Sequence, residues 1–121
     1  MPGRSAQARL DDIRDALNGI SATLDGVAFD QFRKTWYLQP AVERGLEIIS
    51  EASRSLPDEM KAMAPSVPWP AIAGIGNILR HEYQRVEPTI VWNIVEDHLM
   101  ALRLAIELIS ASLETRDAEA P

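Results

Sequence analysis

The sequence predicts an all-α protein, an up-down bundle of four helices. Apolar residues recur every three or four positions over four long stretches, which is typical of helices that bury one face. No stretch alternates convincingly between apolar and polar residues, as a half-buried strand would. The short connections favour an up-down-up-down order. We expect a single domain over residues 1–121, with flexible ends at about 1–6 and 115–121.

The first two predicted helices cover residues 9–24 and 30–56. Gly26 follows the first helix, as glycine often does where a helix closes in a left-handed conformation. Asp30 is the expected N-cap of the second, and Pro40 is expected to kink or divide it; we favour a kink. Their apolar stripes are Leu10, Ile13, Leu17, Ile20 and Leu24, and then Phe32, Trp36, Val42, Leu46, Ile49 and Leu56.

A proline-rich loop follows, in which Trp69 is expected to pin the loop to the core. The third helix is predicted over residues 71–84, and the fourth from Pro88 to about Leu113, because proline suits the first position of a helix. The apolar faces are Ile72, Ile75, Leu79 and Val86, and then Ile90, Ile94, Val95, Leu99, Leu102, Ile106, Ile109 and Leu113.

Composition excludes several classes of site. The chain has no cysteine, so disulfides, thiolate metal sites and a cysteine nucleophile are excluded. The N-terminus lacks the apolar core of a signal peptide, and no apolar run approaches the ~20 residues that cross a bilayer. We therefore expect a cytoplasmic protein without a membrane partner. The net charge of −6 requires any RNA contact to use a local positive patch.

The third helix carries the strongest candidate site. The His81 imidazole can act as an acid or a base, Arg80 can hold a phosphate with a planar fork of donors, and the Tyr83 hydroxyl can be modified. The bland alternative is an ordinary solvated helix face. At about 100° per residue, the polar strip opposite the apolar face consists of Gly76, Asn77, Arg80, His81 and Gln84.

Other candidate sites are weaker. Glu96, Asp97 and His98 are adjacent, and adjacent side chains on a helix point in different directions. A metal site using His81 and His98 would need two helices and a carboxylate to converge. Neither a phosphate-binding glycine loop nor a zinc-protease motif is present, so we expect no metal and no cofactor. Three tryptophans beside apolar positions are expected to pack in the core: Trp36, Trp69 and Trp92.

Three segments match a known pattern. They read P-W-P-A-I-A-G-I-G-N-I-L-R-H-E-Y-Q-R-V, V-W-N-I-V-E-D-H-L and, upstream, Q-P-A-V-E-R-G-L-E-I-I-S-E-A. They resemble the HepT-like branch of the HEPN superfamily, whose second helix usually ends in I-I-G-E-A. The resemblance runs from about Leu10 to Ile109 and implies a HEPN-type four-helix bundle that forms a two-fold homodimer. Members of this branch are small bacterial proteins encoded beside a minimal nucleotidyltransferase, and several are toxins of toxin–antitoxin pairs.

The family motif reads R-x4-H-x-Y. The resemblance implies that its arginine and histidine cleave RNA without a metal, in a cleft between two protomers. It also implies that the partner nucleotidyltransferase silences the toxin by placing AMP on the tyrosine. Carried over, His81 is the catalytic histidine, Tyr83 is the AMP acceptor, and Asn77 matches the polar residue after the motif arginine.

The chain departs from this motif at Gly76, where the family arginine should stand, and at Pro70, which replaces a basic residue. Arg80 remains, and its long side chain is the candidate replacement for the missing cation. Three functions stay open. The protein is an RNase toxin of a type VII pair, or a weakened or inactive dimer that binds the nucleotidyltransferase and accepts AMP, or a purely structural helical dimer.

Overall fold

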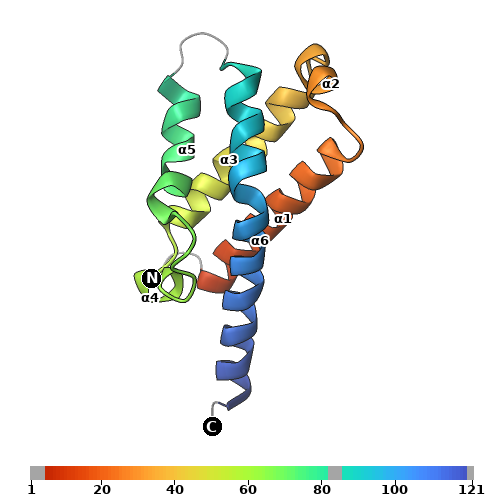
Figure 1. The fold of residues 1–121 in the computed structure, drawn as a ribbon. Coiled ribbons are helices and arrows are strands. Elements are labelled where there is room, and N and C mark those ends of the chain that lie inside the picture. The colour runs from red at the N-terminus through yellow and green to blue at the C-terminus, as the bar shows by residue number, and fades with distance from the viewer. Residues whose placement is uncertain (1–4, 82–85, 120–121) are drawn as a thin grey trace.

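The computed structural model describes residues 5–81 and 86–119, apart from the side chains of His81 and residues 117–119. Figure 1 shows a bundle in which the four long helices run in alternating directions. No strand occurs in the ranges just given, and the predicted all-α fold is confirmed. The helices are α1 (Ala6–Leu24), α2 (Phe29–Lys34), α3 (Leu38–Arg54), α4 (Asp58–Lys61), α5 (Trp69–His81) and α6 (Pro88–Glu119).

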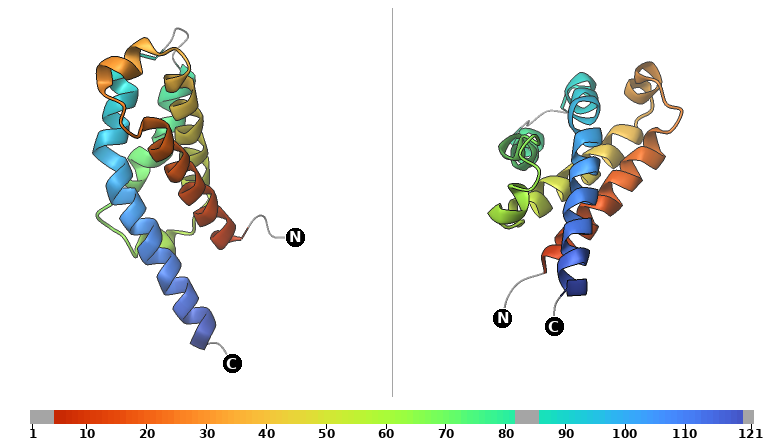
Figure 2. Two further views of the ribbon diagram at one scale, coloured as in Figure 1. Left: turned by 90° about the vertical axis from the view of Figure 1, so that its right-hand side faces the viewer. Right: turned by 60° about the horizontal axis from the view of Figure 1, so that its bottom comes forward.

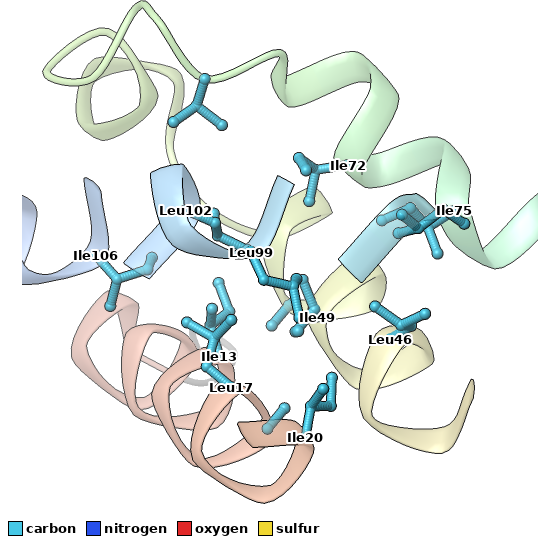
Figure 3. Close-up of a cluster of buried hydrophobic side chains, with 14 of the residues drawn as sticks. Ile13, Leu17, Ile20, Leu46, Ile49, Ile72, Ile75, Leu99, Leu102 and Ile106 are labelled. Atoms are coloured by element: carbon cyan, nitrogen blue, oxygen red, sulfur yellow. The ribbon is translucent and has the colours of Figure 1, made fainter. Parts of the chain in front are cut away.

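The core lies between the four long helices, and α3 packs against both α1 and α5. The two further views in Figure 2 show that the last part of α6 extends beyond the other helices. Over the described residues, no helix combines the length and the apolar character that a membrane span needs. Figure 3 shows side chains from four helices converging, among them Ile13, Leu17, Ile20, Leu46, Ile49, Ile72, Ile75, Leu99, Leu102 and Ile106.

The second predicted helix is divided rather than kinked. It forms α2 and α3, which are separated by residues 35–37. Pro40 does not cause the break, because it lies in the first turn of α3, where backbone N–H groups have no acceptor within the helix. Trp36 falls in the break and is 77% exposed, so its predicted place in the core is wrong.

Asp30 is not the N-cap that the sequence predicted. Ala28 holds that position, and Asp30 lies in the first turn of α2. Its carboxylate is paired with Lys34 and Arg33. Hydrogen bonds from Lys34, and then from Arg33, lower the pKa of the Asp30 carboxyl below its ordinary value.

Other helix ends follow local chemistry. α1 begins earlier than predicted because the Ser5 hydroxyl accepts a hydrogen bond from the Ala8 backbone N–H at 3.1 Å. Gly26 follows the end of α1 with a φ of 71°, the conformation for which glycine was predicted there. Pro88 begins α6 as predicted, and the helix continues past Leu113.

Trp69 does pin the proline-rich loop to the core. It is buried, and its Nε1 donates to the carbonyl oxygens of Lys61 at 3.0 Å and Ala64 at 3.1 Å. These bonds fix the loop against the first residue of α5. Trp92 also packs as predicted, with ring centroids 5.5 Å from Phe29 and 5.2 Å from Phe32.

Candidate functional site

Ser50 on α3 is hydrogen-bonded to α5 beside Gly76. The Ser50 Oγ donates to the carbonyl oxygen of Ala73 at 2.7 Å and accepts from the backbone N–H of Gly76 at 3.0 Å. Gly76 is buried, so its predicted place on an exposed polar strip is wrong. A Cβ at position 76 would lie only 3.0 Å from the Ser50 Oγ, which is closer than ordinary packing allows. The missing side chain is what lets α5 approach α3 here.

The Arg80 guanidinium occupies the remaining space beside Gly76. A Cβ at position 76 would lie 2.9 Å from Nη1 and 3.3 Å from Nη2 of Arg80. Arg80 also donates from Nη2 to the Asn77 Oδ1 at 2.9 Å, and both side chains are exposed. The cation of Arg80 therefore lies next to position 76, one turn before its own place on the helix.

Arg54, which sequence reasoning missed, joins this group from α3. Its Nε donates to the Ala73 carbonyl oxygen at 3.1 Å, and its Nη2 lies 3.4 Å from the Asn77 Oδ1. Arg54 stands four residues after Ser50 and therefore on the same face of α3. The sequence alone shows that Ser50 and Arg54 share one face of a helix. It does not show which residues of α5 lie opposite them, because that depends on how α3 and α5 pack.

The two arginines form a local positive patch on an acidic protein. Within the described ranges, neither Arg54 nor Arg80 has a carboxylate oxygen within 4.0 Å, whereas Arg14, Arg33 and Arg44 each do. The shared acceptor of the patch is the neutral amide oxygen of Asn77. Guanidinium groups bind phosphates through parallel N–H donors, so the patch has the chemistry to hold an anion.

The remaining candidate residues lie at the edge of what the structure describes. His81 follows Arg80 as the last described residue of α5, and its side chain and the whole of Tyr83 lie outside the described residues. The chain resumes at Val86, whose carbonyl oxygen accepts a hydrogen bond of 2.7 Å from the buried Gln39 Nε2. This bond fixes Val86 to the start of α3.

The weaker candidates are not brought together. Glu96 and Asp97 are exposed on α6 and His98 is half-buried. Among the side chains that the structure describes, no group of three or more histidines and carboxylates is placed to hold a metal ion.

Comparison with known proteins gives a consistent result. The family model for ribonuclease HepT-like proteins matches residues 13–109. A Methanocaldococcus jannaschii protein named "Putative RNase MJ1380" is 30% identical over 90% of this chain and 100% of its own length. A second from that organism, "Putative RNase MJ0127", is 33% identical over 97% of both chains. "Probable ribonuclease HepT" of Thermococcus cleftensis is 33% identical over 83% of this chain and 91% of its own.

No solved structure matches the chain significantly. The family match nevertheless covers four-fifths of the sequence, including α3 and α5 with the two arginines and Asn77. The all-helical fold agrees with the HEPN-type bundle that the sequence predicted. The chain therefore belongs to the ribonuclease HepT-like family.

Proposed function

We propose that the protein is the toxin of a type VII toxin–antitoxin pair, a metal-independent RNA endonuclease that acts in the cytoplasm. A partner nucleotidyltransferase silences it by transferring AMP to Tyr83. Membership of a ribonuclease family supports the substrate class. The observation that carries the proposal is the position of the Arg80 guanidinium, which lies beside Gly76 where the motif arginine of the family would begin.

The proposed reaction needs three groups. A base removes the proton from the ribose 2′-hydroxyl, whose oxygen attacks the adjacent phosphorus. An acid protonates the 5′-oxygen as its bond to phosphorus breaks, which leaves a cyclic phosphate and a free 5′-hydroxyl. His81 from each of two protomers supplies the base and the acid. Arg80, held by Asn77, stabilises the negative charge on the phosphorus oxygens.

The proposal therefore requires a two-fold homodimer. An isologous interface brings both copies of His81 to one axis. Several large apolar side chains on α5 and α6 are exposed and available for such an interface, among them Ile78, Leu104 and Leu108. We expect sedimentation at micromolar concentration to give the mass of a dimer. A monomer under those conditions would remove the shared cleft.

AMP on Tyr83 would block this site for two reasons. Its phosphate adds negative charge that can pair with Arg80, three residues earlier in the sequence, and its nucleoside would fill space that RNA needs. A free phenol, with a pKa of ~10, is protonated at neutral pH, so the partner enzyme must supply the base and the ATP donor.

Gly76 favours a second candidate function. Position 76 carries no charge, and losing a charged transition-state contact commonly lowers a rate by ~10²–10³. If Arg80 does not replace that contact, the protein is a weak or inactive dimer whose role is to bind the nucleotidyltransferase and accept AMP.

One experiment separates the two functions. Purified protein is incubated with RNA, and separately with the partner enzyme and ATP. We expect the wild type to cleave RNA and the His81→Ala variant to be inactive while remaining folded. We also expect a mass gain from AMP that is absent from Tyr83→Phe. Modification without cleavage would leave only the second function, and undiminished cleavage by His81→Ala would end the assignment to this site.

A further inference from the structure

We infer that Arg54 and Arg80 form a clamp for one phosphate group of an RNA strand, with Arg54 as the second cation of the site. The identity of the ligand rests on the proposed function. The clamp places a cation from α3 beside the Arg80 guanidinium, which itself lies next to position 76.

The geometry of Asn77 supports a single clamp rather than two separate arginines. Its Oδ1 accepts from the Nη2 of Arg80 at 2.9 Å and faces the Nη2 of Arg54 at 3.4 Å. Two guanidinium groups on one acceptor atom are close enough to contact the same phosphate. The positive charges of Arg54 and Arg80 repel each other when both lie beside the same Asn77 oxygen, and an anion bound between them would relieve that repulsion.

Each arginine is held by a contact within the protein and keeps N–H groups that have no acceptor among the described residues. Arg54 is fixed by the hydrogen bond from its Nε to the Ala73 carbonyl oxygen. Arg80 is fixed because its guanidinium packs against Gly76. Among the residues described, the Nη1 of Arg54 has no hydrogen-bond acceptor, and neither has the Nη1 of Arg80, which is the guanidinium atom nearest to position 76. Both side chains are exposed to solvent. The open donors can therefore form the parallel bonds that a phosphate accepts.

A phosphate could come from the RNA backbone or from an AMP group, so the experiment has an arm for each. The first ligand is a 2′-O-methylated RNA oligonucleotide, which lacks the attacking hydroxyl and reports binding without cleavage. The second is free AMP. Affinity for each is measured by titration at several salt concentrations, with unmodified protein.

Arg54→Gln is the test variant, because it removes the charge and keeps an amide donor for the Ala73 carbonyl oxygen. We expect Arg54→Gln to bind the oligonucleotide about tenfold more weakly. The slope of log affinity against log salt concentration should be shallower by ~0.7, which is the contribution of one phosphate contact on single-stranded nucleic acid. Arg54→Lys keeps the charge and should keep the salt dependence. The matched control is Arg44→Gln, also on α3, whose side chain is 72% exposed and pairs only with Glu47 at 3.6 Å among described carboxylates. It should match the wild type.

Wild-type affinity and salt dependence in Arg54→Gln would overturn the clamp. Loss of AMP binding alone, with oligonucleotide binding unchanged, would overturn the assignment to RNA. Cleavage of ordinary RNA, measured in parallel, keeps the proposed function separate. A protein that cleaves RNA but binds it independently of Arg54 retains the nuclease and loses the clamp, whereas Arg54-dependent binding without cleavage retains the clamp and loses the nuclease.

Discussion

Adding one methyl group at position 76 should displace the Arg80 guanidinium. The substitution Gly76→Ala puts a Cβ at 2.9 Å from the Arg80 Nη1 and 3.0 Å from the Ser50 Oγ. The arginine is flexible and exposed and can swing away. Ser50 cannot move freely, since it is 2% exposed and bonded on both sides to α5. The matched control is Gly74→Ala on the same helix, where a Cβ meets nothing within 4 Å.

The magnitude follows from two opposing effects. Replacing glycine by alanine inside a helix stabilises it by about 1 kcal/mol, which Gly74→Ala should show in full. Gly76→Ala has the same gain, but it breaks the Arg80–Asn77 hydrogen bond, which contributes about 1 kcal/mol, and it compresses Ser50. We therefore expect the two variants to differ by roughly 1–2 kcal/mol in the free energy of unfolding. At roughly 4 °C per kcal/mol, the melting temperatures should differ by several degrees.

Urea denaturation of both variants, with and without Arg80→Ala, gives the measurement. When Arg80 is already absent, Gly76→Ala has no guanidinium to displace and should recover about 1 kcal/mol, so the two substitutions should not be additive. The rate of RNA cleavage by Gly76→Ala should be at least tenfold lower, because the added methyl group moves the Arg80 guanidinium away from position 76. If Gly76→Ala and Gly74→Ala stabilise the protein equally, the Arg80 guanidinium does not pack against Gly76.

Four further outcomes test other contacts. Gly76→Arg alone should not raise cleavage, because the new side chain and Ser50 compete for space, whereas Gly76→Arg combined with Ser50→Gly should, in the same RNA assay. Trp69→Phe should lower the free energy of unfolding by about 1–3 kcal/mol, because the indole N–H that is shared between two carbonyl oxygens is lost; urea denaturation measures it. Gln39→Ala should cost a similar amount and increase amide exchange around Val86 and Glu87, which mass spectrometry can follow. Asp30 has a lowered pKa, so its ion pairs stabilise the fold above about pH 4 and are lost as the pH falls through the folded pKa. Asp30→Asn should thus be less stable than the wild type at neutral pH and equal to it in strong acid, by thermal melting across pH.

Most of the fold could be predicted because the buried face of a long helix appears in the sequence as apolar residues every three or four positions. The apolar stripes of α1, α3, α5 and α6 and the tryptophan in the loop follow from spacing. The exception is Ile90, which was predicted on the buried face of α6 but is 38% exposed, while its neighbour Val91 is buried. The position of the break between α2 and α3, at residues 35–37, could not be predicted. Pro40 suggested a kink or break at its own position, but it lies in the first turn of α3, where a proline does not interrupt the helix. Trp36 was misplaced for the same reason: its spacing fits a continuous helix, which the chain does not form.

The candidate site was predicted only in part. Arg80 and Asn77 are exposed and bonded to each other, one turn apart on one face of α5, as helical spacing implies. The burial of Gly76 could not be predicted, because it depends on Ser50 reaching across from another helix. Arg54 was missed because its relation to Asn77 exists only once α3 and α5 pack in one particular register.

The most direct measurement is the rate of RNA cleavage by Arg80→Ala against the wild type, under single-turnover conditions with enzyme in excess. If the Arg80 guanidinium replaces the cation missing at position 76, the variant should stay folded and cleave ~10²–10³ times more slowly. Arg44→Ala, which removes an arginine on α3 outside the site, should cleave at the wild-type rate. An Arg80→Ala rate equal to that of the wild type would contradict the assignment of the transition-state cation to Arg80.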